Sequence, residues 1–178
     1  LVSCLRHAIK RIDIGNPGAV FSIKPQAPGR LDVGGEELYS SLMLSEGGQV
    51  QQAHQPAMPA TTVWDSLQTA QGHWLATHAG LFFAVANGVH QRVHADDPVL
   101  GAPARVLIER DGDLWIGTLR GLSRLREGVA REVRPAGGRA FGYVYALCLN
   151  VEQRLWVATL GRGLWRETEN GWVQVLGG

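Results

Sequence analysis

The chain has 178 residues, of which 45% are hydrophobic and 19% charged, a composition that can build the core of one globular domain. Its 17 basic and 16 acidic residues give a net charge of +1, so no charge excess favours binding to nucleic acid or to an anionic membrane. We therefore expect no nucleic-acid partner.

The sequence is organised in similar units. Residues 1–14 contain two short apolar stretches that match the second half of the later units, and so predict a partial unit. The next unit, residues 15–56, contains an apolar run and the stretch GRLDVGGEEL. Three further units cover residues 57–98, 99–138 and 139–178. Because the first half of the N-terminal unit is missing, we expect the chain to be a piece of a longer repeat array.

A tryptophan recurs in the last three units within a similar apolar phrase: WLATHAGL, LWIGTLRGL and LWVATLGRGL. Trp74, Trp115 and Trp156 lie 41 residues apart, and such a fixed period indicates a repeat architecture. In the 15–56 unit, Asp32 stands at the tryptophan position.

Each unit predicts four short strands. An apolar run precedes the tryptophan phrase, a Gly-Leu pair follows it, and a glycine turn leads to a last alternating stretch. In the segment RDGD, the pair Asp111-Gly112 favours a tight hairpin. Repeats of about forty residues with four antiparallel strands predict an all-β fold, a β-propeller. It would hold four blades plus the partial N-terminal blade and belong to a larger propeller.

The tryptophans are predicted to pack between neighbouring blades rather than to stack on a ligand, each burying on the order of 200 Å². Small residues after them would let the adjacent sheet approach closely. The structural anchors of the repeat are then Trp74, Trp115, Trp156, Gly117, Gly121 and Gly163.

Four of the six histidines, His73, His78, His90 and His94, fall in the 57–98 unit. On a strand, His90 and His94 would lie about 13 Å apart, too far to share one ion. We therefore expect surface histidines, with no metal site and no cofactor.

The sequence contains no catalytic motif, so no catalytic residue is assigned. Asp111 and Asp113 flank Gly112, where aspartate is expected for turn geometry alone. Cys148 lies in an apolar run and is expected to be a buried free thiol, with pairing to Cys4 as the alternative.

Loops after the tryptophan strands, together with the links between units, should form one rim of the propeller, where binding residues concentrate. Arginines there could clamp a carboxylate or sulfate through two hydrogen bonds, or could be ordinary solvated loop charges. The candidate ligand-binding residues are His78, Arg120, Arg162, Arg139 and Tyr143.

The segments DGDLWIGTLRGLSRL and RLWVATLGRGLWR resemble the two-component regulator propeller repeat, with the match running over about residues 19–175. The first complete unit departs from this pattern, since Asp32 and Gly35 stand where Trp and Thr are expected. The resemblance implies a non-catalytic, ligand-sensing domain of a bacterial hybrid histidine kinase or diguanylate cyclase. That domain would lie on the periplasmic side of the inner membrane, in a parent chain anchored in the membrane.

The resemblance also implies a small-molecule or glycan-like ligand and a dimeric sensor. Open blade ends would expose unpaired strand edges and an apolar blade face, so we expect either further chain or self-association through these ends. Two alternatives stay open, because a fold does not fix a function. A lyase-like enzyme on the propeller scaffold would need acid and base groups converging on one rim. A protein-docking platform would need none.

Overall fold

The computed structural model describes residues 18–54, 60–84 and 89–177; the predicted partial unit at residues 1–14 lies outside them. The described residues form four antiparallel sheets of four strands, and each sheet keeps the sequence order of its strands from edge to edge. The predicted all-β propeller fold with four-stranded blades is thereby confirmed. Blade 1 holds β1 (Val20–Ala27), β2 (Arg30–Gly35), β3 (Leu38–Leu44) and β4 (Val50–His54); blade 2 holds β5 (Val63–Gln68), β6 (His73–Thr77), β7 (Gly80–Ala84) and β8 (His90–Val93); blade 3 holds β9 (Ala104–Arg110), β10 (Asp113–Thr118), β11 (Leu122–Arg126) and β12 (Val129–Val133); blade 4 holds β13 (Val144–Leu149), β14 (Leu155–Thr159), β15 (Gly163–Thr168) and β16 (Gly171–Leu176).

Tight turns connect the strands within a blade. Asp111 and Gly112 both have positive φ, 55° and 77°, as the predicted Asp-Gly hairpin between β9 and β10 requires. Glu127 and Gly128 form the same kind of turn between β11 and β12, with φ of 51° and 80°. The described residues contain no helix that is long and apolar enough to cross a membrane.

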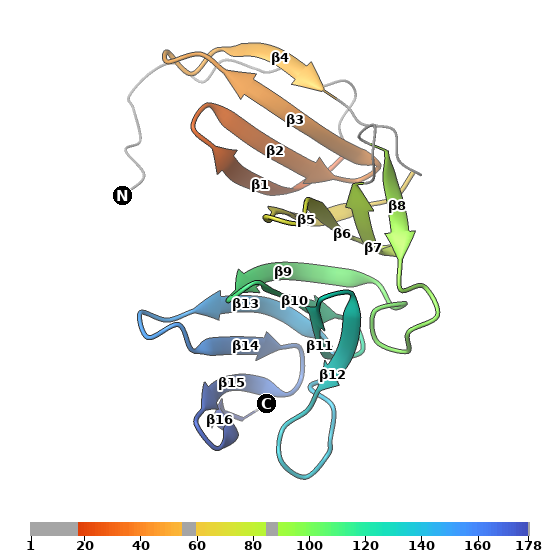
Figure 1. Ribbon diagram of the computed structural model, residues 1–178, viewed down its shortest axis with the longest axis vertical. Helices are drawn as coiled ribbons and strands as arrows, with labels where there is room; N and C mark the ends of the chain where they lie inside the picture. Colours follow the sequence, from red (N-terminus) through yellow and green to blue (C-terminus); the bar gives the residue numbers. More distant parts are fainter. Residues whose placement is uncertain (1–17, 55–59, 85–88, 178) are drawn as a thin grey trace.

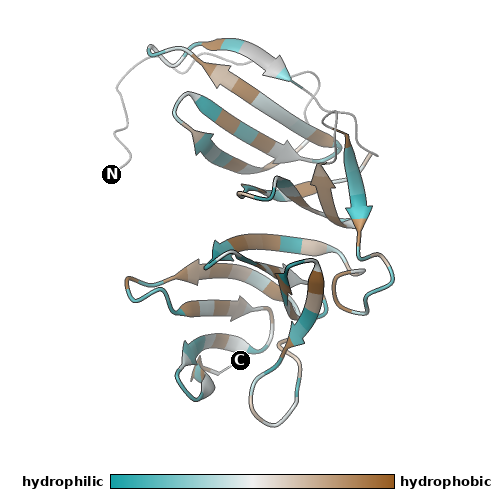
Figure 2. Ribbon diagram, viewed as in Figure 1, coloured by the Kyte–Doolittle hydropathy of each residue, from teal (hydrophilic) through white to brown (hydrophobic). Residues whose placement is uncertain are grey.

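The blades fan out around their first strands, as Figure 1 shows. The first strands β1, β5, β9 and β13 contact one another in series and are the inner strands, whereas β4, β8, β12 and β16 are the outer ones. In blade 2, Figure 2 shows a hydrophobic β7 beside a hydrophilic outer strand β8. Because β7 is covered by neighbouring strands and blades, it needs apolar residues at consecutive positions.

One edge of every blade carries both the β2–β3 type of loop and the link to the next blade, and we call this edge the link rim. In each blade, the same backbone hydrogen bond ties this loop to the segment that leads into the first strand of that blade, on the same edge. The loop amides of Glu36, His78, Leu119 and Leu160 donate to the carbonyl groups of Ala19, Thr62, Pro103 and Tyr143, over 2.8 to 3.0 Å.

The tryptophans occupy two of the contacts between blades. Trp74 packs in a cluster with Leu107 and Leu114 of blade 3. Trp115, only 4% exposed, packs with Leu155 and Val157 of blade 4. Trp156, on blade 4, is half-buried.

Glycine allows close packing between blades 3 and 4. A Cβ at Gly117 would lie 2.6 Å from the Cγ1 atoms of both Val106 and Val144, whereas a Cβ at Gly121 would lie 3.6 Å from its nearest neighbour. Gly117→Ala is therefore expected to lower the free energy of unfolding by about 1–3 kcal/mol through overpacking. Urea denaturation would measure this, with Gly121→Ala as the matched control. Equal stability of the two variants would contradict the predicted close contact.

Two expectations from the sequence are wrong. Cys148 is exposed rather than buried, because within the described residues the extensive contacts of its inner strand β13 with another blade are all with blade 3. Asp113 does more than flank a turn: it is buried, and its carboxylate forms ion pairs with Arg124 and Arg126 of the neighbouring strand β11.

Candidate functional site

Side chains from three successive inner strands meet near the link rim. Trp64, Arg105 and Tyr145 are each the second residue of their strand, β5, β9 and β13 respectively. The guanidinium carbon of Arg105 lies 5.2 Å from the ring centroid of Trp64 and 4.8 Å from that of Tyr145. The arginine is thus in cation–π contact with an aromatic ring from each neighbouring blade.

Two loop residues extend this group. His78, in the β6–β7 turn, meets Trp64 edge-on with ring centroids 5.5 Å apart. Tyr143, in the link before β13, lies 6.1 Å from Tyr145 between ring centroids. We call these five residues the inner-strand cluster: Trp64, His78, Arg105, Tyr143 and Tyr145.

The inner-strand cluster combines exposed aromatic surface with a positive charge. Tyr145 is 53% exposed and His78 is also exposed, while Trp64 and Arg105 are half-buried. Among the described residues, the guanidinium of Arg105 has no hydrogen-bond or ion-pair partner. The two cation–π contacts with Trp64 and Tyr145 leave the N–H groups of Arg105 without a hydrogen-bond acceptor in the part of the chain that the structure describes. Five such donors in a planar fork match the geometry of a carboxylate or a sulfate.

The structure brings together two of the residues predicted from the sequence, His78 and Tyr143. Arg120 and Arg162 make other contacts: their guanidinium groups donate to the carbonyl oxygens of Pro98 and Ala140 over 3.2 and 2.5 Å. Each arginine thereby holds a link against its own loop. Arg139 is exposed in the link between β12 and β13.

Sequence reasoning missed Trp64, Arg105 and Tyr145. A signal was present, because these residues lie 41 and 40 residues apart and occupy one position of the repeat. That position alternates aromatic, cationic and aromatic side chains, which core packing alone does not require. The tryptophan phrase marks the second strand of each unit, whereas these three residues lie on the first strand.

Two of the predicted surface histidines are in fact buried between blades 1 and 2. His73 is 7% exposed and His90 is 4% exposed. The Nε2 atom of His73 lies 2.9 Å from Oδ2 of Asp32, and its Nδ1 lies 3.0 Å from Nε2 of His90. The hydroxyl of Tyr39 contacts the ring of His73 at 3.1 Å from Nε2. Asp32, standing at a tryptophan position, therefore supports a polar contact between blades where the next two units place a buried tryptophan.

Burial sets the protonation of this group. Burial alone would raise the pKa of the Asp32 carboxyl, but hydrogen bonds from His73 and Tyr39 outweigh it and hold the pKa below its usual value. Burial, reinforced by the neighbouring His73, lowers the pKa of His90 to about 4. Burial and the charge of Asp32 raise the pKa of the Tyr39 hydroxyl. Asp32 is thus a carboxylate and His90 a neutral ring at pH 7.

A second buried carboxylate joins the inner strands. Asp65 accepts hydrogen bonds from the backbone amides of Ser66 and Leu107, both over 2.9 Å, and pairs with Lys24 at 3.1 Å. Burial raises the pKa of Asp65, and Lys24 offsets part of this effect. The carboxylate connects β1, β5 and β9, so its role is to hold three blades together.

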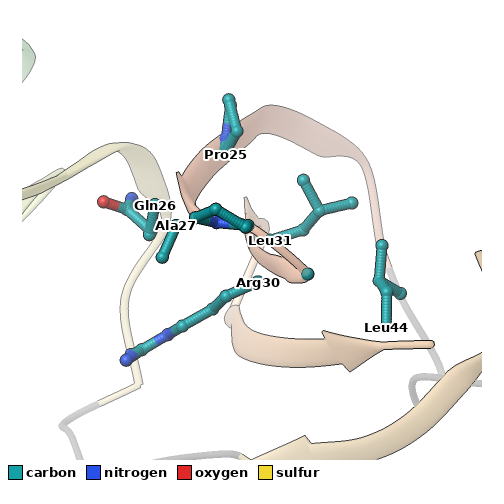
Figure 3. A pocket seen from close by; sticks show the side chains of 8 residues that line it. Pro25, Gln26, Ala27, Arg30, Leu31 and Leu44 are labelled. Atoms are coloured by element: carbon teal, nitrogen blue, oxygen red, sulfur yellow. The ribbon is translucent and has the colours of Figure 1, made fainter. Parts of the chain in front are cut away.

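A surface hollow lies at the β1–β2 hairpin of blade 1, shown in Figure 3 with Pro25, Leu31 and Leu44 on its walls. Its one charged side chain, Arg30, donates to the hydroxyl of Ser41 over 2.9 Å. No set of polar groups converges in it. Among residues 18–54, 60–84 and 89–177, no group of three or more His, Cys, Asp or Glu side chains is placed to hold a metal ion.

Solved structures share this architecture. The extracellular domain of the putative hybrid two-component system BT4673 from B. thetaiotaomicron superposes with a TM-score of 0.69 and 15% identity, covering 90% of this chain and 22% of that one. The fold is a β-propeller. Virginiamycin B lyase from Staphylococcus aureus gives a TM-score of 0.65 at 15% identity, covering 88% of this chain and 55% of that one. The WD40 β-propeller domain of Doa1 gives 0.63 at 16% identity, covering 91% and 55%.

At these identities the similarity establishes the fold alone. The chain spans between about a fifth and just over half of the length of these proteins. No protein-family model matches the sequence, and no curated protein matches it either.

Proposed function

We propose that this propeller segment is the ligand-sensing module of a bacterial signal-transduction protein, non-catalytic in itself and located outside the cytoplasm. The similarity to the extracellular domain of a putative hybrid two-component system supports this role, together with the repeat resemblance of blades 3 and 4. The parent protein would be membrane-anchored. Ligand binding would change its output to the extent that the ligand binds two signalling states with different affinity.

The ligand is recognised at the inner-strand cluster and carries an anionic group. The observation that supports this most is the unpaired guanidinium of Arg105 between two aromatic rings. Its donors would bind a carboxylate or sulfate, while Trp64 and Tyr145 offer flat apolar surface to a sugar ring or a similar body. Tyr143 and His78 add polar groups at the edge. An acidic glycan fragment fits this chemistry.

Cellobiouronic acid and its uncharged counterpart cellobiose form a matched pair of probes for this proposal. Titration calorimetry should show at least tenfold tighter binding of the acid, because charge-assisted hydrogen bonds contribute about 1.5–3 kcal/mol. Arg105→Gln should remove this preference. Arg120→Gln is the control, since its guanidinium is bound to Pro98.

Binding that survives Arg105→Gln but is lost in Arg120→Gln would move the site to the link-rim loops.

The similarity to virginiamycin B lyase supports a lyase as the second candidate. Chromatographic detection of an unsaturated product after incubation with an oligosaccharide whose uronic acid carries a sugar on O4, which serves as the leaving group of the elimination, would favour this lyase over a sensor.

A further inference from the structure

A cavity between blades 2 and 3 lies outside the inner-strand cluster. It has a volume of about 200 Å³, and the walls come from β6, β7 and β8 of blade 2 and from β10 and β11 of blade 3. Its apolar walls are Trp74, Phe83, Val93, Leu114 and Leu125. An engineered cavity of about 150 Å³ with similar walls binds benzene, so this volume is large enough for one six-membered ring.

The next pair of blades explains why the cavity exists. Between blades 3 and 4, the side chain of Arg110 crosses the ring of Trp115 at 4.8 Å and pairs with Glu167 of blade 4. A second guanidinium, from Arg124, lies 5.7 Å from the same ring. A charged pair and a cationic side chain therefore occupy this contact.

The repeat places shorter and apolar residues at the same positions one blade earlier. Thr69 corresponds to Arg110, because each closes a two-residue turn by pairing with the residue that follows it, Gly72 and Asp113 respectively. Phe83 stands opposite Trp74 as Arg124 stands opposite Trp115. Leu125 stands opposite Leu114, whereas Glu167 in the next blade accepts a hydrogen bond from the backbone amide of Leu155. The long side chain that would cross Trp74 is thus absent.

The polar side chains that line this cavity are Gln71, His94 and Glu127, and each is exposed or half-buried. Gln71 donates to the carbonyl of Gly112 over 3.3 Å and is thereby engaged. Glu127 is exposed and, within the described residues, its carboxylate has no hydrogen-bond or ion-pair partner. His94 is half-buried beside it. Nearby, Arg124 and Arg126 form ion pairs with Asp113. Arg126 also interacts electrostatically with Glu127, but within the described residues it forms no ion pair with that carboxylate.

We propose that this cavity is a second binding site, for a small compound with one apolar ring and a cationic group. The ring would lie against Trp74 and Phe83, in the space that Arg110 fills between blades 3 and 4. The cation would reach the carboxylate of Glu127. Nothing in this site depends on the inner-strand cluster.

Benzylamine tests the proposal, with benzyl alcohol as the neutral compound of the same shape and methylamine as the cation without a ring. The indole N–H signal of Trp74 in ¹⁵N NMR of the full chain is the readout. We expect a dissociation constant on the order of 1 mM for benzylamine, given the size of the ligand. Benzyl alcohol should bind about threefold to fivefold more weakly, and methylamine should not bind.

Two variants test where the ring of benzylamine lies and which residue binds its cationic group. Thr69→Arg should weaken benzylamine binding at least tenfold, because the arginine would fill the cavity as Arg110 does one blade later. Glu127→Gln, an exposed substitution that leaves the walls intact, should weaken it about threefold and make benzylamine and benzyl alcohol equal. No shift of the Trp74 signal with benzylamine, an unchanged affinity in Thr69→Arg, or equal affinity for the two ring compounds in the native chain would each overturn the proposal.

Discussion

Acidification from pH 6.5 to pH 4 is expected to remove about 3 kcal/mol of folding stability through His90 alone. The pKa of His90 is lowered from 6.5 to about 4 in the folded chain. Within this window the unfolded chain therefore binds the proton that the folded chain excludes, so the free energy of unfolding falls as the pH falls. The cause is burial: His90 is 4% exposed and its Nδ1 atom has no hydrogen-bond partner in the described part of the chain.

Urea denaturation at several pH values between 7 and 4 measures this effect. His90→Gln removes the titrating ring and should flatten the curve above pH 4, while His54→Gln controls for the loss of a histidine at an exposed position. Other groups also titrate: stability from Asp32 is lost only below pH 3.8, since its pKa is lowered, and the raised pKa of Asp65 acts in the opposite direction. The difference between the native chain and His90→Gln isolates His90. Parallel curves for these two proteins would contradict its assignment.

Trp115→Ala is expected to destabilise the chain by about 3–5 kcal/mol, whereas Trp156→Ala, at the same repeat position, should cost much less. Trp115 is 4% exposed between blades 3 and 4 and contacts the arginines on both of its neighbouring strands. Trp156 is half-buried, with the guanidinium of Arg166 5.8 Å from its ring. Truncation at position 115 leaves a cavity between two blades, while truncation at 156 exposes little new surface.

Thermal and urea denaturation of the two variants provide the comparison. Because both substitutions remove the same side chain from equivalent strands, the difference reports the contact between blades and not the intrinsic preference of tryptophan for a strand. Equal losses of stability would show that the tryptophans act within their own sheets.

The sequence by itself determined the blades. The 41-residue spacing of Trp74, Trp115 and Trp156, with glycine turns between apolar runs, predicted four-stranded antiparallel sheets, and the structure confirms them. This succeeded because the hydrogen bonds and turns of a blade form between strands that are neighbours in sequence. The local pattern also placed His78 in the candidate site, because a loop that directly follows a strand can be predicted from neighbouring residues.

Tertiary structure alone decided what the blades do to one another. Asp32 and His73 are 41 residues apart, and Arg105 receives its rings from two different blades. Such contacts depend on the distance and angle between sheets, which no pattern within one unit encodes. For the same reason His90 was expected on the surface and is buried, because a strand shows which residues share a face but not whether another blade covers it.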